Sequence, residues 1–236
     1  MIEVRDLSVR YGAVEALRGI TLTAQPGHTT AVLGANGAGK SSLLRAISGI
    51  SPVTGGEILL NSKAIQTVPP EKRSQLGLAH AMEGRRIFKQ LAVHENLELA
   101  WSFGARKIDL QKGIREVYDR FPILGEKSTT AGGLLSGGQQ QMLILSCATI
   151  RNPTHLLLDE PSLGLAPIIV NQIYDFIASF ARDTGATVII AEQMATMALK
   201  VSNYGYVLRG GKVVVDGESK ELLRNGIAET LSSSYL

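Results

Sequence analysis

The stretch "GANGAGKSS" at residues 34–42 constrains the fold of this chain more than any other feature. It follows the apolar run "TTAVL" and precedes the helical pattern "SLLRAIS". These segments give the pattern G-x-x-x-x-G-K-[ST] between a strand and a helix, which is the context that the pattern requires. A chance match in a chain of this size has a probability on the order of 1%, so a merely glycine-rich turn is the weaker alternative. We therefore expect a phosphate-binding loop within an α/β fold.

The residue types of this loop suit the binding of a nucleotide. Its glycines let backbone N–H groups curl around an anion, and the N-terminus of the following helix adds a partial positive charge. Lys40 is placed to reach the terminal phosphates, and Ser41 is placed to offer its hydroxyl to Mg²⁺. The residues expected to contact the nucleotide here are Gly34, Ala35, Asn36, Gly37, Ala38, Gly39, Lys40, Ser41 and Ser42.

Composition places the chain among ordinary globular proteins. Its 236 residues are 44% hydrophobic and 19% charged, which argues against disorder. The longest apolar runs fall far short of the ~20 residues of a membrane-spanning helix, and the charged N-terminus "MIEVRDLSVR" does not resemble a secretory signal. We therefore expect a soluble, cytoplasmic protein.

Charge and cysteine content exclude some classes of function. The net charge of +3, without a basic run longer than two, is too weak to indicate a nucleic-acid partner. It would not oppose contact with anionic lipid headgroups. The single cysteine, Cys147, excludes internal disulfides and a cysteine-built metal site, and its apolar neighbours predict a buried structural thiol.

Apolar runs punctuated by glycine alternate with helical patterns along the chain, which predicts an α/β architecture. Strands are expected at 2–9, 20–24, 30–33, 57–60, 156–158, 187–191, 205–208 and 213–215. Helices are expected at 40–48, 95–101, 108–120, 137–151, 168–182, 195–201 and 219–224. The section up to about Leu60 is expected to form an antiparallel sheet of short strands. Residues 88–150 show helices and no convincing strand, so we expect a helical subdomain inserted between 1–87 and 151–236.

The segment "HLLLDEP" at residues 155–161 is an apolar strand that ends in two acids. Alone this pattern is weak, because many strands run into an acidic loop. Combined with the phosphate-binding loop, it predicts that Asp159 holds Mg²⁺ through water. Glu160, one residue farther out, can then polarise the water that attacks the γ-phosphate.

The segment "LLSGGQQQ" at residues 134–141 predicts a second anion site. Ser136 is expected to cap a helix, and Gly137 and Gly138 expose backbone N–H groups at its N-terminus. A glycine hinge with a capped helix is the alternative. A second phosphate site has no use in a monomer that already holds its nucleotide, so the pattern indicates closure over the nucleotide of another copy.

In this order and spacing, the three motifs resemble those of the ATP-binding subunits of ABC transporters. Gly34–Ser41 matches the Walker A motif, Leu135–Gln139 the ABC signature and His155–Glu160 the Walker B motif. The resemblance covers essentially the whole chain. It implies a P-loop NTPase core of the ABC ATPase type, with an N-terminal antiparallel β-subdomain and an inserted helical subdomain. In that family two such domains sandwich two ATP molecules, each held by the Walker A motif of one chain and the signature of the other.

The resemblance also implies roles for single residues. Ser136 and Gly138 would contact the γ-phosphate bound to the partner, and the loop "PSLGLAP" from Pro161 would cross the dimer. Tyr11 in "RYGAVEAL" would stack on adenine, although an ordinary aromatic residue at a strand end is the alternative.

Finer features are similar to the smaller ATPase subunit of branched-chain amino acid importers. They are "EGRRIF" at 83–88, "EQM" at 192–194, "GYVLRGGKVVVDG" at 205–217 and the short length. Urea importers have similar ATPases, so the solute stays open between branched-chain amino acids and urea or another amide.

Two positions depart from the usual pattern of the wider family. Glu83 stands where most members have the Q-loop glutamine, and we expect it as a further metal ligand beside Ser41 and Asp159. Gln193 stands at the position of the switch histidine. Because an amide does not titrate, Gln193 is expected to orient the γ-phosphate by hydrogen bonding rather than to act as a base. Its neighbour Glu192 is expected only to solvate the loop, and His80 and His94 to be structural or surface residues.

The sequence thus predicts an energy-coupling ATPase that uses ATP and Mg²⁺ at the cytoplasmic face of a membrane, with Glu160 and Gln193 as the catalytic pair. The resemblance implies as partners a second ATPase subunit, either a longer homologue or another copy, two membrane permease subunits and, indirectly, a periplasmic-type solute-binding protein. No nucleic-acid partner is expected.

Two other functions compete with this interpretation. A soluble ABC ATPase of translation, repair or cluster assembly usually has fused domains, coiled-coil insertions or basic additions, and none is visible here. A non-catalytic regulator would be expected to lose Lys40 or Glu160, and both residues are present.

Overall fold

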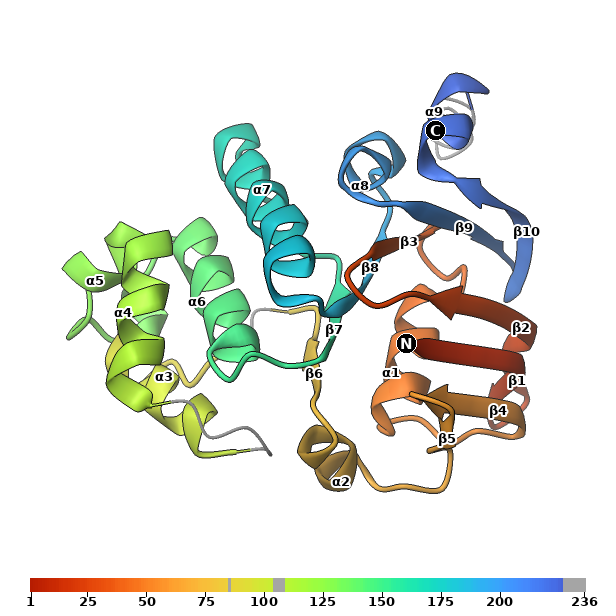
Figure 1. The fold of residues 1–236 in the computed structure, drawn as a ribbon, viewed down its shortest axis with the longest axis horizontal. Helices are drawn as coiled ribbons and strands as arrows, with labels where there is room; N and C mark the ends of the chain where they lie inside the picture. The colour runs from red at the N-terminus through yellow and green to blue at the C-terminus, as the bar shows by residue number, and fades with distance from the viewer. Residues whose placement is uncertain (85, 104–108, 227–236) are drawn as a thin grey trace.

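The computed structural model describes residues 1–84, 86–103 and 109–226. At its centre lies a largely parallel sheet in which the strands follow the order β10, β9, β3, β8, β7, β6 (Figure 1). Only the edge strand β10 runs antiparallel to its neighbour among these described strands. The strands are β3 (Thr29–Leu33), β6 (Leu78–Ala81), β7 (His155–Asp159), β8 (Thr187–Glu192), β9 (Tyr204–Arg209) and β10 (Lys212–Glu218).

The central strands are buried on both faces, because helices cover each side of the sheet. In β8, Val188 and Ile190 belong to the core that α7 (Pro167–Thr184) covers, whereas Ile189 and Ala191 belong to the core that α1 (Lys40–Ser48) covers. Every residue of β3, β7 and β8 is buried. This explains why these strands read as continuous apolar runs rather than as alternating patterns.

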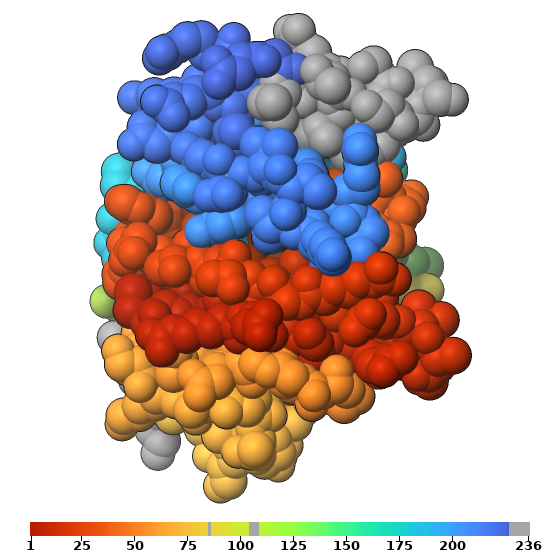
Figure 2. Space-filling model, turned by 90° about the vertical axis from the view of Figure 1, so that its right-hand side faces the viewer, coloured from red at the N-terminus to blue at the C-terminus, as the bar shows by residue number. Residues whose placement is uncertain are grey.

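A second, antiparallel sheet packs on α1 from its other side, and its strands follow the order β2, β1, β4, β5. Figure 2 shows β1 and β2, in red and orange, as a band below the blue C-terminal strands. The strands are β1 (Ile2–Tyr11), β2 (Val14–Ala24), β4 (Gly55–Leu60) and β5 (Lys63–Ala64).

The antiparallel sheet expected in the section up to about Leu60 forms, but the expectation was wrong for one strand of that section and for the length of two others. The segment Thr29–Leu33 pairs in parallel with β8 and β9 in the central sheet, where it is buried on both faces. The strands β1 and β2 have 10 and 11 residues. They pair over most of their length because a tight turn at Gly12, with φ of 58°, reverses the chain between them.

A buried arginine fixes the C-terminal end of α1. Arg73 lies in α2 (Pro70–Gln75) and is only 2% exposed. Its Nη1 donates hydrogen bonds to the carbonyls of Ala46 at 2.7 Å and Ile47 at 2.8 Å. These carbonyls belong to the last turn of α1, where a cation is favoured by the helix dipole. These hydrogen bonds fix the C-terminal end of α1 against α2.

The elements described within 93–103 and 109–149 are all helical, and they lie on the left of Figure 1. The elements are α3 (Val93–Ser102), α4 (Leu110–Arg120), α5 (Pro122–Glu126), the 3₁₀ turn η1 (Gly132–Leu134) and α6 (Gly137–Thr149). Asn96, which is 3% exposed, fastens the entry to this region by accepting from Phe88 N and donating to the carbonyls of Phe88, Leu91 and Ala92. The division of the chain into a core and an inserted helical subdomain remains a proposal.

Most expected elements form within a few residues of their expected bounds. Helices α1, α8 (Ala195–Val201) and α9 (Ser219–Arg224) match them. The helix expected at 108–120 begins at Leu110, with Asp109 as its N-cap, and Ile108 lies outside the described residues. Five short elements were not expected: β5, β6, α2, α5 and η1. They are two to six residues long, too short for hydrophobic periodicity to show.

No helix in the described ranges is both long and apolar enough to cross a membrane.

Acid should destabilise the fold through two buried histidines. Burial is the main reason that the pKa of His80 and that of His155 are each lowered from 6.5 to about 4. On acidification the unfolded chain takes up these protons first, so the free energy of unfolding falls as the pH drops from about 6.5 towards 4. We expect the urea midpoint to fall over this interval, and to fall less steeply in a His155→Asn variant when each protein is compared with its own value at pH 7.

The exposed His28 provides the matched control for this titration. A His28→Gln variant should follow the pH profile of the unmodified protein. If His155→Asn gave that same profile, the buried imidazole would not be the origin of the acid sensitivity.

Candidate active site

The carboxyl ends of β3, β7 and β8 meet at one edge of the central sheet, where α/β folds place ligands. The register sets Leu33 beside Glu192 and Asp159 beside Ala191. Two backbone hydrogen bonds continue this pairing into the loops: Gly34 N donates to Glu192 O at 3.3 Å, and Glu160 N donates to Ala191 O at 2.9 Å. The loop at 34–39, the acids after β7 and the residues after β8 are therefore held side by side.

The loop before α1 forms a cradle that only glycine permits at two positions. A Cβ on Gly34 would lie 2.6 Å from the carbonyl oxygen of Leu208, and one on Gly39 would lie 2.9 Å from that of Ala16. Gly39 also has φ of 110° and is the N-cap of α1, whose first turn contains no acidic residue. Asn36 and Gly37 are exposed at the rim of the loop, Ala38 is buried, and Ala35, Ser41 and Ser42 are half-buried. The cradle fits the phosphates of a nucleotide.

Lys40 is 4% exposed, and its ammonium group is fully engaged. Its Nζ donates to the carbonyls of Gly34 at 2.9 Å and Ala35 at 3.1 Å, and lies 3.1 Å from Glu160 Oε1. The side chains of Lys40 and Glu160 are 3% and 8% exposed. Each buried charge therefore compensates the other, and a phosphate that binds Lys40 must compete with Glu160.

Asp159 has one carboxylate oxygen without a protein partner. Its Oδ1 accepts a hydrogen bond from Ser41 Oγ at 2.9 Å, whereas its buried Oδ2 has none within the described residues. Burial raises the pKa of Asp159 above its usual value, the Ser41 hydroxyl opposes that shift, and the charges of Glu83 and Glu160 add to it. The charge of Arg45 also opposes the shift, but no ion pair joins Asp159 to a cation within the described residues.

These features fit Mg²⁺ held partly by the nucleotide. The described residues contain no cluster of three or more His, Cys, Asp or Glu that could hold a metal by itself. Mg²⁺ commonly takes one or two carboxylates and completes its shell with phosphate oxygens and water. Ser41 and Asp159 would provide the protein side of such a site. Glu83 is exposed in the loop after β6 and its charge reaches Asp159, so it stays a candidate ligand.

The left-handed backbone of Glu160, with φ of 48°, is uncommon for a residue other than glycine. It turns the chain sharply away from β7. Gln193 follows β8 and is half-buried. Both residues therefore sit at strand ends beside the loop that holds Lys40, but their catalytic roles remain proposals.

The expectation that Glu192 merely solvates its loop was wrong. Glu192 is the last residue of β8 and is 2% exposed. It accepts three hydrogen bonds, two of them from Ser162. A charged residue that continues a fully apolar strand must be buried with it and therefore needs donors. That signal was present in the sequence, but the partner, Ser162, was not identifiable from spacing.

The signature residues lie apart from this group. Ser136 is the N-cap of α6: its Oγ accepts from Gln139 N at 3.4 Å, and Gln139 Oε1 accepts from Ser136 N at 3.0 Å. No hydrogen bond or ion pair among the described residues joins 136–138 to Lys40, Asp159 or Glu160. Figure 1 shows α6 and α1 on opposite sides of β6 and β7. Packing also favours glycine at position 138, because a Cβ there would lie 3.1 Å from the side chain of Ile169.

Tyr11 ends β1 and is 41% exposed. Its hydroxyl lies 2.6 Å from Ser51 Oγ, which holds the ring near the end of α1. This is compatible with a stacking role, which stays a prediction.

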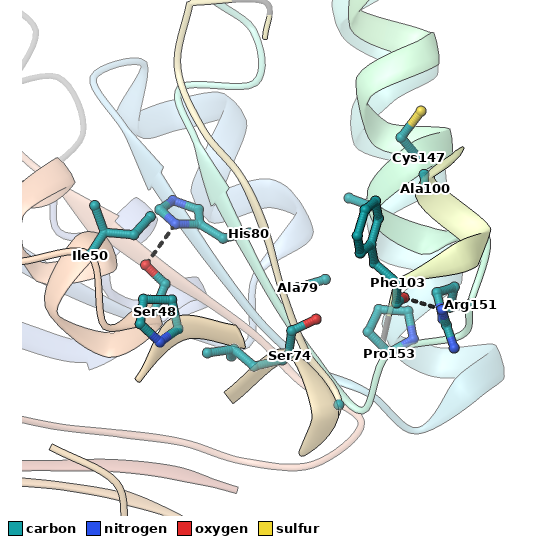
Figure 3. Close-up of a pocket in the computed structure, with 14 residues that line it drawn as sticks. Ser48, Ile50, Ser74, Ala79, His80, Ala100, Phe103, Cys147, Arg151 and Pro153 are labelled. Carbon is teal, nitrogen blue, oxygen red and sulfur yellow. Dashed lines mark hydrogen bonds between the residues drawn. The ribbon is translucent and has the colours of Figure 1, made fainter. Parts of the chain in front are cut away.

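A separate cavity of about 310 Å³ lies between β6 and helices α3 and α6 (Figure 3). Ile50, His80 and Phe103 are among its lining residues, and Ile50 and Phe103 are 49% and 66% exposed. His80 Nδ1 lies 3.0 Å from Ser48 Oγ. Cys147 lines the same cavity, and burial raises the pKa of its thiol to about 12, which keeps it protonated.

Comparison with known sequences gives a family match. Residues 17–163 match the family described as ABC transporter. BraG of Pseudomonas aeruginosa, a high-affinity branched-chain amino acid transport ATP-binding protein, is 38% identical over 95% of this chain and 96% of its own length. LivF of Archaeoglobus fulgidus, a probable branched-chain amino acid transport ATP-binding protein, is 34% identical over 98% of both chains.

Solved structures share the fold. An ATP-binding cassette of an ABC transporter superposes with a TM-score of 0.87 at 22% identity, over 98% of both chains. A dimeric cassette in a post-hydrolysis state, bound to ADP and Pi, gives a TM-score of 0.84 at 20% identity and covers 93% of this chain and 99% of its own. The expected fold class is thereby confirmed.

Removing the charge of Asp159 should stabilise the nucleotide-free protein while removing the metal response. An Asp159→Asn variant keeps the oxygen that accepts from Ser41 but no longer buries a carboxylate that forms no ion pair within the described residues. Because about 1 kcal/mol shifts the melting temperature of a chain this size by roughly 2–4 °C, we expect a rise of that order in a thermal melt. The additional stabilisation that Mg²⁺ gives with nucleotide should disappear.

An Asp119→Asn variant is the matched control, since it removes the charge of an exposed carboxylate in α4, outside the residues assigned to the nucleotide site. It should keep the response to Mg²⁺. A lower melting temperature for Asp159→Asn, together with an unaltered Mg²⁺ response, would contradict the assignment of Asp159.

Proposed function

Because the chain belongs to the ABC transporter family as an ATP-binding subunit, we propose that it couples ATP hydrolysis to the import of branched-chain amino acids. ATP binding and hydrolysis are the activity of the family. The solute is inferred from the two relatives, which resemble this chain over nearly its full length. The single observation that carries the catalytic assignment is the buried cluster in which Lys40 meets Glu160 and Ser41 meets Asp159.

Binding of the phosphates is proposed to rearrange the Lys40–Glu160 ion pair. Lys40 would turn from Glu160 towards the phosphates, which the loop amides and the N-terminus of α1 also hold. A carboxylate that is paired with an ammonium group is a weak base. Once released, Glu160 can accept a proton from the attacking water. This order would keep the base inactive until a nucleotide is present.

The other residues of the cluster position the reactants. Ser41 and Asp159 would hold Mg²⁺, which supplies positive charge against the charge that develops on the transferred phosphoryl group. Gln193 would donate a hydrogen bond from its amide and orient the γ-phosphate or the water, because its side chain cannot take up a proton at neutral pH.

A second ATPase subunit is proposed to complete the site. Ser136, Gly137 and Gly138 lie apart from Lys40 in this chain. The N–H groups of Gly137 and Gly138 belong to the first turn of α6, where no intrahelical acceptor is available, and this turn contains no acidic residue. Large apolar side chains are exposed near these loops: Leu134, Leu163, Ile168 and Met194. Exposed apolar side chains of this kind favour a protein interface. The partner would be a second copy or a longer homologous subunit.

The cavity of Figure 3 is proposed as the contact with a membrane permease subunit at the cytoplasmic face of the membrane. The exposed Ile50 and Phe103 offer apolar surface to a short helix of such a subunit. Strand β6 lines the cavity and leads within two residues to Glu83, whose charge reaches Asp159. A displacement of β6 would therefore transmit a conformational change between the permease and the nucleotide site. A solute-binding protein on the other side of the membrane would contact only the permease subunits.

A soluble ABC ATPase without a transport role is the weaker candidate. Two relatives that match over nearly the full length are named as transport proteins. Urea or another amide stays the alternative solute.

Replacement of Glu160 by Gln should abolish hydrolysis while nucleotide binding persists. General base catalysis contributes roughly 10²–10⁴-fold, so we expect the turnover rate to fall by at least about 100-fold. Gln keeps the shape of the side chain and frees Lys40 from its ion pair, so the dissociation constant for ATP should stay equal or decrease. Glu116→Gln, in the exposed part of α4, is the matched control. An undiminished turnover rate for Glu160→Gln would contradict the assignment of Glu160 as the general base.

The solute is tested by uptake into proteoliposomes that contain the full transporter and ATP inside. Labelled leucine, isoleucine and valine should accumulate with the unmodified subunit and not with Glu160→Gln. Uptake of urea in place of these amino acids would show that the chain serves the alternative solute. A purified protein that hydrolyses ATP but joins no membrane subunits would instead support the soluble class.

A further inference from the structure

Glu192 is a buried carboxylate that the proposed mechanism does not use. It closes β8 and is 2% exposed. No ion pair to Glu192 occurs within the described part of the chain, so hydrogen bonds alone stabilise it there. An ionised group in such a place is costly unless donors surround it, which makes the identity of those donors informative.

The two oxygens of Glu192 serve two different loops. Oε1 accepts from Ser162 N at 3.1 Å and from Ser162 Oγ at 2.7 Å. Oε2 accepts from Gln193 N at 3.1 Å. The backbone oxygen of Glu192 also accepts from Gly34 N at 3.3 Å, at the start of the phosphate loop. One residue thus joins three segments of the site.

Ser162 lies in the segment 161–166 that runs from Glu160 to α7. Ser162 is 3% exposed, whereas the next residue, Leu163, is 55% exposed, and Ile168 in the first turn of α7 is 68% exposed. Ser162 therefore holds the segment to the protein, while Leu163 faces outward. A protein that contacts the outer side would shift the backbone N–H of Ser162, and with it the carboxylate of Glu192.

Tyr174 of α7 is a third buried residue beside Ser162 and Glu192. It is 2% exposed and lies near Ser162 and Glu192, and burial together with the negative charge of Glu192 raises the pKa of its hydroxyl. That hydroxyl makes no hydrogen bond of good geometry within the described residues, although it is close enough to Ser162 and Glu192 to interact with both. The well-formed hydrogen bonds to the carboxylate therefore come from the two loops.

We propose that Glu192 is a positioning residue that couples the segment 161–166 to Gln193, so that a second subunit seated on that segment sets the position of Gln193. The inference rests on the proposed function, in which 161–166 faces the second subunit and Gln193 faces the γ-phosphate. Glu192 acts through Gln193 and does not itself touch the reacting atoms.

The substitution Glu192→Gln tests this proposal with little change of volume. The amide replaces one acceptor oxygen by a donor, so either Ser162 N or Gln193 N loses its partner. We expect turnover by the assembled transporter to fall roughly tenfold to hundredfold, as for a small misplacement of a reacting group, while the dissociation constant for ATP changes by less than about twofold.

A double variant shows whether the effect passes through Gln193. If Glu192 acts by positioning Gln193, then Glu192→Gln should cost less than about twofold in turnover when Gln193→Ala is already present, because the two residues act as a unit. If the double variant instead lost turnover by the product of the losses of the two single variants, the proposal would be overturned. Tyr174→Phe is the matched control within the same cluster and should leave turnover unchanged.

Hydrogen–deuterium exchange of the nucleotide-free protein provides a readout that does not depend on activity. In Glu192→Gln, amides of 161–166 and of 193–195 should lose protection together, while those of β7 keep it. Ser162→Ala removes only the hydroxyl donor. In this variant the amides of both segments should also lose protection, but by less than in Glu192→Gln. Loss confined to one segment, or unchanged protection in both, would contradict the coupling.

The two kinds of failure can be told apart. An unmodified transporter that hydrolyses ATP, with unaltered exchange in both variants, would refute the coupling and leave the proposed function standing. Coupled exchange in a protein that never hydrolyses ATP would refute the proposed function instead. If Glu192→Gln does not fold, Ser162→Ala supplies the same comparison in exchange and turnover.

Discussion

The buried ion pair between Lys40 and Glu160 is the interaction on which the site depends. The side chains of these two charged residues are 3% and 8% exposed, and each compensates the buried charge of the other. Their meeting requires that β3 and β7 end at the same edge of the sheet and that Gly34 and Gly39 let the loop fold back towards β7. The parallel sheet, the glycine cradle and the left-handed turn at Glu160 are therefore parts of one arrangement.

Three carboxylates lie at the ends of neighbouring strands, and their surroundings give each a different role. One oxygen of Asp159 accepts from the Ser41 hydroxyl, and the other has no hydrogen-bond partner in the part of the chain that the structure describes, which suits a metal. Glu160 forms an ion pair with Lys40, and a phosphate can replace Glu160 as the partner of that lysine. Glu192 is held by backbone and hydroxyl donors of two loops, which suits a fixed support. The same functional group is thus suited to act as ligand, base or anchor according to its partners, and these are the roles that we propose for the three residues.

Local motifs made much of this fold predictable from sequence, whereas long-range pairing did not. Helix α1 forms at its expected bounds because the glycine loop and Lys40 fix its start, and Ser136 caps α6 as its position predicts. The segment Thr29–Leu33 was assigned to the wrong sheet, because periodicity identifies a strand but not its neighbours. The same limit hid the role of Glu192, since its partner Ser162 lies 30 residues away along the chain.

The most direct test of this account is a structure of the protein with Mg²⁺ and a non-hydrolysable ATP analogue. The account predicts that Lys40 Nζ leaves Glu160 for the phosphate oxygens, that Asp159 Oδ2 gains a metal-bound partner, and that Glu160 faces the position of the attacking water. A Lys40–Glu160 ion pair that persists at 3.1 Å beside a nucleotide bound elsewhere on the chain would contradict it.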